Sequence, residues 1–424
     1  MLKAGSTRRP SREERRRVLI IVQNLPVPFD RRVWLECQTL AEAGYQVAVV
    51  CPKGPGDPSR AVLNGVELYK YRPYAPGGSK ASFVAEYVYS FLATFWLSLQ
   101  AARKGRIYAV QACNPPDIFW PIGLAFRALF GSRFVFDHHD LCPELYESRF
   151  PDGPKAVHSA LLFLERRTVA TADHVIETND SYRAVDIERN GAAPQRSTVV
   201  RTGPDPDRLK PISPVPELRR GRRHLAAYIG VMGPQDGVDI AMQVADVVVH
   251  ELGRSDIGFT LMGSGDSWQD LLALRDKLGL EDYVEMTGRV PDETVAAVLS
   301  TADIGISPDP KNPLNDVSTM NKTMEYMAFA LPVVAFDLRE TRVSAGEAGV
   351  YATPNDVHEM AKLLVELVDD EDRRKAMGAA GRARVESQLA WQHQAVRYRA
   401  VYDNLLGPQV YHTSEDIEEK QATL

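Results

Sequence analysis

The chain has 424 residues, of which 44% are hydrophobic and 25% are charged, and its formal net charge is −6 at pH 7. This composition is that of a globular protein, and it excludes a fibrous or wholly disordered chain. The length exceeds what one ordinary hydrophobic core accommodates, so we expect two domains.

The two ends of the chain carry opposite charge. Residues 1–16 form a basic arm and residues 407–424 an acidic tail, and we expect both to be disordered. A basic arm can attract anionic lipid or nucleic acid, but a solvated arm is the favoured interpretation, and no nucleic-acid partner is predicted. The beginning of the sequence lacks the apolar segment of a signal peptide, which favours a cytoplasmic protein.

Four cysteines are scattered along the chain: Cys37, Cys51, Cys113 and Cys142. Their spacing is not that of a metal site, so we expect reduced thiols and no metal framework.

A first α/β domain is predicted over residues 17–208. It opens with the apolar run Val18–Gln23, typical of a strand buried in a parallel sheet. Asp30 is a plausible N-cap for a helix over Arg31–Ala43, and a second strand follows at Gln46–Cys51. This βαβ unit predicts a doubly wound sheet, with further strands near Val66–Tyr71, Ala109–Ala112, Arg133–Asp137, His174–Glu177 and Thr198–Arg201.

One long apolar segment, Phe83–Ala102, interrupts this pattern. Its length approaches that of a membrane span, but polar residues break it and the chain has no second segment of this kind. A helix that is buried or lies on a membrane surface is therefore favoured over a true span.

Residues 209–223 are rich in Pro and Arg and are predicted to link the first domain to a second one over residues 224–388. This second domain again alternates strands and helices. A helix over residues 389–406 is expected to pack back on the first domain. The predicted elements of the second domain are strands at Leu225–Gly230, Gly258–Met262, Val284–Thr287 and Ile304–Ser307, a strand through Val350, and helices at Val238–Glu251, Ser267–Leu278, Asp292–Ser300 and Asp356–Asp369.

The stretch from Asn312 to Asp337 predicts a polar loop, a helix over Ser318–Ala330 and a short strand over Pro332–Phe336. The first turn of a helix leaves backbone N–H groups unpaired, and such groups bind anions. Lys322 and Glu325 are three residues apart and share a helix face, where they offer one cation and one carboxylate. A solvated helix face is the plain alternative.

Five motifs stand out: N-K-T-M-E-Y-M-A-F-A-L-P-V-V-A at 321–335, G-S-G-D at 263–266, T-G-R-V-P at 287–291, T-A-D-I-G-I-S-P at 301–308 and D-H-H-D-L-C-P-E at 137–144. Taken together, they resemble the retaining glycosyltransferases of family 4, which have the GT-B architecture, and the motif at 321–335 is the most specific. The resemblance implies two Rossmann-like doubly wound domains facing a central cleft. It also implies a nucleotide-sugar donor held mainly by the second domain.

By this resemblance, Glu325 matches the second glutamate of the family's E-x7-E motif, which accepts hydrogen bonds from ribose hydroxyls. A carboxylate suits that role because it only accepts hydrogen bonds. The first glutamate of the motif falls on Val317, so Asp316 and nearby backbone N–H groups are the candidates to hold the donor sugar.

Many relatives also carry an Arg and a Lys after the first strand of the second domain, whereas this chain reads Y-I-G-V-M-G-P-Q-D-G. Gly230, Gly233 and Gly263 still permit the backbone to approach a phosphate. Lys322 is the candidate cation for the diphosphate, and Arg289 and Arg201 are alternatives.

In the first domain, the family places a histidine after the D-H-H-D strand, and His139 matches it best. Asp140 is a candidate to fix the His139 tautomer or accept a proton. The plain alternative is that the histidines simply cap the strand. Asn24 and Arg32 follow the first strand, on the acceptor side. Arg32 is a candidate to hold an acceptor phosphate, and a surface ion pair is an equal alternative.

The resemblance implies sugar transfer from a nucleotide diphosphate to a glycan or a lipid-linked acceptor, with retention and without a required metal or other cofactor. His139, Asp140 and Lys322 are the candidate catalytic residues. A role in cell-surface polysaccharide or glycolipid synthesis is expected, with a membrane surface as a further candidate partner. The alternatives are a nucleotide-sugar epimerase of the same architecture and a non-catalytic partner that binds nucleotide sugar.

Overall fold

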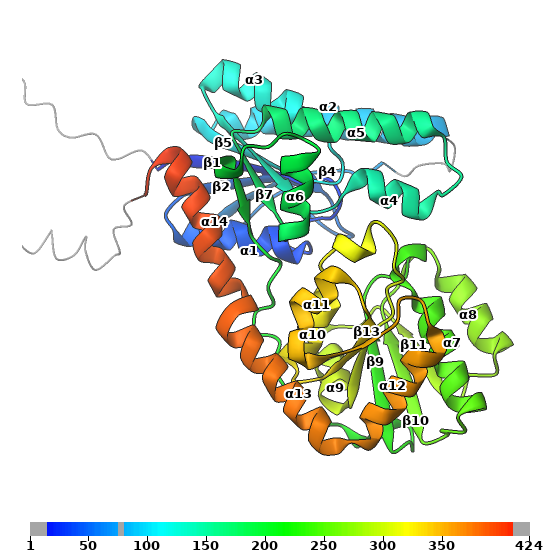
Figure 1. Ribbon diagram of the computed structural model, residues 1–424. Coiled ribbons are helices and arrows are strands. Elements are labelled where there is room, and N and C mark those ends of the chain that lie inside the picture. Colours follow the sequence, from blue (N-terminus) through cyan, green and yellow to red (C-terminus); the bar gives the residue numbers. More distant parts are fainter. Residues whose placement is uncertain (1–14, 75–79, 410–424) are drawn as a thin grey trace, which may run out of the picture. The chain divides into compact units, whose positions relative to one another are not determined.

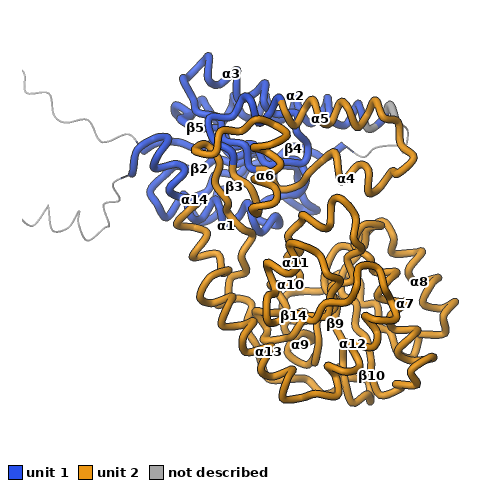
Figure 2. Tube along the Cα trace, viewed as in Figure 1, with its two compact units in different colours: residues 1–137, 167–175, 398–424 blue, residues 138–166, 176–397 orange. Residues whose placement is uncertain are grey.

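The computed structural model describes residues 15–74 and 80–409, so the predicted basic arm and acidic tail lie almost wholly outside the described residues. The chain divides into two compact units (Figure 2). Unit 1 comprises residues 1–137, 167–175 and 398–424, and unit 2 comprises residues 138–166 and 176–397. Each unit is therefore built from segments that are far apart in the sequence.

The first sheet has eight strands in the order β3-β4-β2-β1-β5-β6-β7-β8 (Figure 1). Its pairs are parallel except for β3 and β4 among those with a recorded register. From β1 the sheet grows in one direction through β2 and β4, and from β5 it grows in the opposite direction through β6, β7 and β8. This reversal is the doubly wound pattern. The strands are β1 (Arg17–Ile21), β2 (Gln46–Pro52), β3 (Arg60–Leu63), β4 (Val66–Tyr71), β5 (Ile107–Cys113), β6 (Arg133–His138), β7 (His174–Glu177) and β8 (Ser197–Val199).

Helices alternate with these strands. Asp30 caps the first of them as predicted, because its carboxylate accepts a hydrogen bond from the Val33 N–H at 3.1 Å. The helices are α1 (Arg31–Glu42), α2 (Lys80–Ala102), α3 (Trp120–Phe130), α4 (Cys142–Arg149), α5 (Lys155–Thr171) and α6 (Asp180–Glu188).

The second sheet has six parallel strands in the order β11-β10-β9-β12-β13-β14. The order reverses between β9 and β12, and ligands of such sheets bind beyond the carboxyl ends of the strands at that point. The strands are β9 (His224–Ile229), β10 (Ile257–Met262), β11 (Val284–Gly288), β12 (Ile304–Ser307), β13 (Val333–Phe336) and β14 (Gly349–Ala352), and the helices are α7 (Val238–Asp246), α8 (Trp268–Lys277), α9 (Asp292–Thr301), α10 (Asn321–Ala328), α11 (Arg339–Ala345), α12 (Val357–Asp369), α13 (Glu371–Arg384) and α14 (Trp391–Leu406).

The predicted fold class of two doubly wound parallel-sheet domains is confirmed. Helix lengths differ in three places. The helix expected over 318–330 is shorter, because Met320 is extended and Ala330 has a positive φ of 56°. The helix expected over 238–251 changes to a π-turn at Val247–Glu251, and the helix expected over 389–406 begins at Trp391, after a second π-turn at Val385–Leu389.

Helix α10 is fixed on the second sheet by one tyrosine. The ring of Tyr326 lies flat against β12, where a Cβ on Gly305 would come within 2.3 Å of it. Its hydroxyl donates to the Ile306 carbonyl at 2.9 Å and accepts from the Ile229 N–H at 3.1 Å. These bonds join α10 to β9 and β12, so the start of α10 lies at the point where the strand order reverses.

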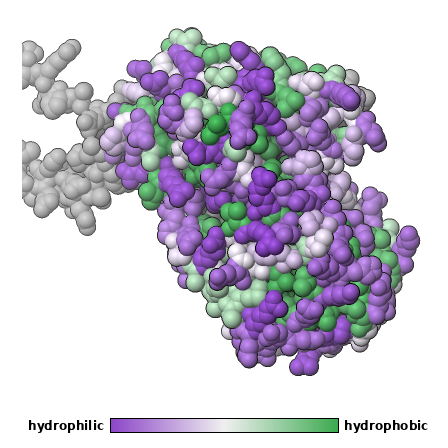
Figure 3. Space-filling view, viewed as in Figure 1, coloured by the Kyte–Doolittle hydropathy of each residue, from purple (hydrophilic) through white to green (hydrophobic). Residues whose placement is uncertain are grey.

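The long apolar segment forms α2, a helix at the edge of unit 1 (Figure 1). Among the described residues, none of the helices combines the length and apolar character needed to cross a membrane. On the face of the molecule shown in Figure 3, hydrophilic residues cover most of the surface and hydrophobic residues form groups between them.

Candidate functional site

Two glycine-containing loops pack against each other at the carboxyl edge of the second sheet. Gly230 follows β9 and Gly263 follows β10, and the Gly230 N–H donates to the Met262 carbonyl at 3.1 Å. Gly263 has φ +138°, and a Cβ there would lie 1.8 Å from the Gly230 carbonyl oxygen. Only glycine fits this close approach, so the backbone itself lines this part of the edge.

The loop after β9 continues into a tight turn that ends at α7. The Gly233 N–H donates to the Asp236 carboxylate at 2.9 Å. Gly237 has φ +67°, and a Cβ on it would lie 2.2 Å from the Pro308 carbonyl oxygen. The loop after β9 is thereby held against the loop after β12, on the two sides of the reversal point.

Lys322 lies in the first turn of α10 and is buried, with 7% of its surface exposed. Its ammonium group forms an ion pair with Asp309, and it lies 5.2 Å from the centre of the Tyr228 ring. The other oxygen of Asp309 accepts a hydrogen bond from the Ser307 hydroxyl at 2.7 Å. A Cβ on Gly230 would lie 3.3 Å from the Lys322 side chain, so Lys322 and the loop after β9 are immediate neighbours.

A second carboxylate, that of Asp236, influences the same lysine. Burial alone lowers the pKa of Lys322, but the charges of Asp309 and Asp236 outweigh it and raise that pKa. Burial raises the pKa of Asp236 to about 6, and the Asp309 charge adds to this effect while Lys322 opposes it. Two carboxylates therefore share one cation. Sequence reasoning missed both, although Asp236 lies in the segment after β9 where the resemblance implies an Arg and a Lys.

Glu325 lies one turn after Lys322 on α10 and is half-buried. Asp316 lies in a short 3-10 turn before α10, where its carboxylate accepts from the Arg339 N–H at 3.1 Å and lies 3.6 Å from the Lys311 ammonium. Asp316 therefore also stabilises the beginning of α11. The candidates that sequence reasoning named around α10 thus come from one short segment of unit 2.

Val317, which stands in place of the family's first glutamate, is a packing residue. It packs with Leu141, Tyr182 and Leu314 in a small apolar cluster, and its carbonyl accepts from the Asn179 amide at 3.0 Å. A carboxylate at this position would lose these apolar contacts, which is a physical reason for the departure from the family pattern.

The two alternative cations have different surroundings. Arg201 is 9% exposed and interacts with Glu340 at 3.4 Å and with the Thr319 hydroxyl at 3.5 Å. Arg289 follows β11 and is exposed. Lys322 is an immediate neighbour of the loop after β9 at the reversal point.

In unit 1, the acceptor-side candidate Arg32 lies in a buried cluster at the ends of β5 and β6. Its guanidinium group pairs with Glu36 at 3.0 Å and Asp137 at 2.9 Å, and the Gln111 amide donates to both carboxylates at 2.8 and 3.1 Å. The predicted alternative of an ion pair is what the structure contains, but the pair is buried rather than on the surface. Asn24, on the loop after β1, is exposed.

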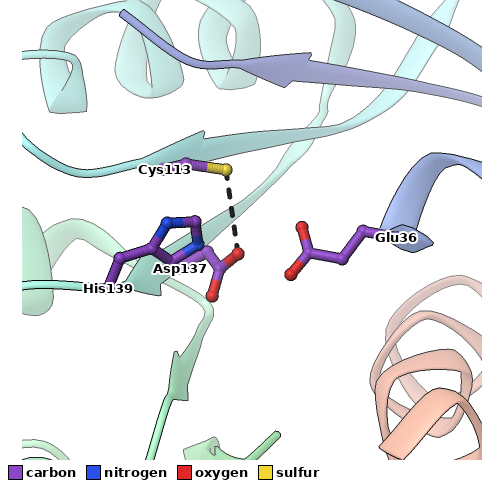
Figure 4. A group of neighbouring side chains, drawn as sticks. All are labelled: Glu36, Cys113, Asp137 and His139. Carbon is purple, nitrogen blue, oxygen red and sulfur yellow. Dashed lines mark hydrogen bonds between the residues drawn. The ribbon is translucent and has the colours of Figure 1, made fainter. Parts of the chain in front are cut away.

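Figure 4 shows Glu36, Cys113 and Asp137 facing one another, together with His139, which follows Asp137 by two residues and belongs to unit 2. Such side chains are of metal-ligating type. The Arg32 guanidinium, however, already supplies the cation to Glu36 and Asp137. Burial and the Asp137 charge raise the pKa of Glu36 well above its usual value, although Arg32 opposes this.

The two adjacent histidines have different environments. His138 is fully buried in unit 2, with its Nδ1 atom 2.8 Å from Asp186 and its Nε2 atom 3.9 Å from Glu165. His139 and Asp140 are half-buried. His138 is therefore a buried packing residue, whereas His139, which sequence reasoning selected, is partly exposed.

Comparisons with known proteins place this geometry in context. Residues 30–208 match the family model described as glycosyltransferase family 4, and residues 223–370 match glycosyl transferases group 1. The D-inositol 3-phosphate glycosyltransferase of Thermobispora bispora is 25% identical over 303 residues, which are 67% of this chain and 68% of the relative. Several other relatives match over a smaller share of their length, such as 39% for the alpha-D-kanosaminyltransferase of Streptomyces kanamyceticus.

Solved structures share the fold. The sucrose-phosphate synthase of Thermosynechococcus elongatus has a TM-score of 0.76 at 17% identity, covering 93% of this chain and all of its own. Anabaena HepE, solved in complex with UDP-glucose, has a TM-score of 0.68 at 14% identity and covers 92% of this chain and 99% of its own. The likeness extends over both sheets.

Proposed function

The chain is a glycosyltransferase of the family 4 type with the GT-B fold, and on that premise we propose that it transfers a sugar from a nucleotide diphosphate to a hydroxyl of a glycan or lipid-linked acceptor. The observation that carries the proposal is the buried Lys322 at the reversal point of the second sheet, beside glycine loops whose backbone a phosphate can approach. The UDP-glucose bound to Anabaena HepE supports this class of donor.

In the proposed complex, the diphosphate lies against the loop after β9 and the first turn of α10. Lys322 exchanges part of its contact with Asp309 for a phosphate oxygen, and the N-terminus of α10 supplies backbone N–H donors. Glu325 accepts hydrogen bonds from ribose hydroxyls, and Asp316 or its neighbouring backbone holds the donor sugar. Burial raises the pKa of Asp236 to about 6, which eases its protonation and so limits its repulsion of the phosphate.

The proposed reaction retains the anomeric configuration. The bond between the anomeric carbon and the leaving phosphate oxygen breaks, and the acceptor oxygen bonds to that carbon on the same face. The acceptor proton passes to the departing phosphate, whose charge Lys322 and the helix N-terminus stabilise. His139 and Asp140 are proposed to orient the reacting groups, and this scheme requires no metal or other cofactor.

The proposed setting is the synthesis of a cell-surface polysaccharide or glycolipid. The enzyme is cytoplasmic in this proposal and associates peripherally with the inner face of the plasma membrane, where a lipid-linked acceptor is presented. The exposed apolar residues of α2 support this location.

The test is a thermal-shift screen of nucleotide sugars on the full chain, since a ligand at 100 times its Kd stabilises the folded state by about 2.7 kcal/mol. For one base, we expect the nucleoside diphosphate to raise the melting temperature strongly and the nucleoside to raise it only slightly. Lys322→Met should abolish the part of the shift that depends on the diphosphate, measured against the ligand-free variant. The matched control Lys362→Met, on an exposed lysine of α12, should retain it.

Turnover then separates the candidate reactions. The active donor incubated with acceptor should release nucleoside diphosphate, and Lys322→Met should lower kcat/KM by about 10²-fold or more. A new epimer formed from the nucleotide sugar alone would instead identify an epimerase. Wild-type donor binding by Lys322→Met would refute the assigned donor site.

A further inference from the structure

Helix α2 carries its polar side chains inward. Ser90, Thr94 and Ser98 recur every four residues along one face, and each is at most 2% exposed. The Ser98 hydroxyl donates to the Thr94 carbonyl at 2.7 Å, and the Ser90 hydroxyl accepts from the Gln23 amide at 3.3 Å. A surface helix of a globular protein normally turns its polar face to water, so this arrangement is reversed.

The outward face of α2 is correspondingly apolar. Val84, Val88, Leu92 and Trp96 also recur every four residues, and their exposed fractions are 63, 54, 59 and 56%. Tyr87 and Tyr89 flank them, and residues 87–102 contain no charged side chain. At 1.5 Å per residue, this exposed stripe runs for about 18 Å along the helix.

Such a stripe is costly in water. Burial of large apolar side chains stabilises a folded protein, and four such side chains exposed in a row forgo that stabilisation. Contiguous apolar patches of this kind mark sites of contact with another surface.

The residues around the stripe indicate what covers it. The Arg103 guanidinium group lies 5.8 Å from the centre of the Trp96 ring, at the carboxyl end of the stripe. The exposed residues Lys104 and Arg106 follow directly, and the Tyr89 hydroxyl donates to the carbonyl of the exposed Arg72. Tyrosine, tryptophan and basic side chains beside an apolar face are the composition of helices that lie in a lipid interface.

We propose that α2 is a lipid-docking surface, with the stripe of Val84, Val88, Leu92 and Trp96 seated at the boundary of the headgroups and acyl chains and Arg103 at anionic headgroups. This inference rests on the peripheral location in the proposed function and specifies the surface responsible. Vesicle binding needs no sugar transfer, so the two proposals fail independently.

The test is flotation of the full chain with vesicles of phosphatidylcholine, with and without phosphatidylglycerol. The wild type should float with both and more strongly with the anionic ones. Leu92→Glu should lower the partition coefficient about tenfold or more, because it places a charge in the apolar boundary. Arg103→Gln should lower it about fivefold on anionic vesicles only.

Val396→Glu is the matched control, because Val396 is 70% exposed on another helix, α14, and should float like the wild type. Each variant is checked for an unchanged melting temperature, since Leu92 is an exposed residue and its replacement should not unfold the chain. Light scattering is recorded in parallel.

Three results would overturn the proposal. Flotation of Leu92→Glu equal to that of the wild type would assign any vesicle binding to another part of the chain, such as the basic arm. A dimer that Leu92→Glu dissociates would identify a second copy of the chain as the occupant of the stripe. A wild type that stays at the bottom of the gradient with both vesicles excludes lipid docking outright.

Discussion

Each unit of the protein contains one buried cation shared by two carboxylates, and the two clusters behave differently. In unit 1, Arg32 lies between Glu36 and Asp137, and all three side chains are at most 5% exposed. In unit 2, Lys322 pairs with Asp309 and is influenced by Asp236. Both follow strands next to the point where a sheet reverses its order.

The difference lies in the chemistry of the two cations. Arg32 binds its carboxylates through separate nitrogens of one planar group, and Gln111 donates to both of them, so the guanidinium group is fixed in place. Lysine is a compact point charge that can change partners, and it lies against glycine loops that a ligand can approach. We therefore interpret the arginine cluster as structural and the lysine cluster as the one available to a ligand.

Loss of the arginine should have the largest effect on stability. Arg32→Met leaves Glu36 and Asp137 buried without a cation, which should cost about 3–5 kcal/mol in the free energy of unfolding. Urea denaturation measures it, with the exposed Arg397→Met as the control. A loss no greater than that of the control would mean that the arginine cluster is not structural.

Asp236→Asn should act in the opposite direction and depend on pH. The pKa of Asp236 is about 6 in the folded chain against an ordinary value of 3.8, so ionisation is harder in the folded state. The raised pKa therefore lowers the free energy of unfolding by its full amount above pH 6 and by almost nothing below pH 3.8. The variant should therefore be more stable by up to about 3 kcal/mol at pH 8 and nearly unchanged at pH 4.

Denaturation at the two pH values measures this difference. Destabilisation by Asp236→Asn at pH 8 would show that Asp236 is ionised and firmly paired, and the lysine cluster would then resemble the arginine cluster.

Arg32→Lys should have an intermediate effect. It keeps the charge but cannot reach Glu36 and Asp137 with the same planar geometry, so we expect a loss of about 1–2 kcal/mol. Measured beside Arg32→Met, it separates charge from geometry. Full retention of stability would remove the distinction between the two cations.

The smallest effect is expected for Glu36→Gln. Burial and the Asp137 charge raise the pKa of Glu36 well above its usual value, so exchange for a neutral amide of similar shape removes a charge that this position disfavours. The melting temperature at pH 7 should change by the equivalent of less than about 1 kcal/mol. A loss comparable with that of Arg32→Met would show that Glu36 is ionised in the folded protein.

Much of the fold could be predicted from the sequence, because strands buried on both faces are continuous apolar runs. The edge strand β3 was missed, although Asn64 and Gly65 form the two-residue turn of its hairpin with β4 and both have a positive φ. Asn-Gly between two short strands is a strong hairpin signal. Here β3 is exposed and antiparallel, so it lacks the apolar run that revealed the other strands.

The site was predictable only where its residues are close in the sequence. Lys322 and Glu325 lie on one helix and could be paired from their spacing. Asp236 follows another strand, and its influence on Lys322 depends on the order of the strands. Arg32 and Asp137 are 105 residues apart, so a sequence pattern cannot show that they meet.

The last helix has a consequence for how the protein is made. Tyr398 and Tyr402 of α14 both donate to the side-chain oxygen of Gln111 on β5, and the residues from 398 onward belong to unit 1. Unit 1 therefore receives its final contacts only after the whole of unit 2 has been synthesised. During translation, the earlier segments of unit 1 lack the contacts of α14 until the residues from 398 onward are made. Unit 2 ends at residue 397, so its chain is complete before those residues are made.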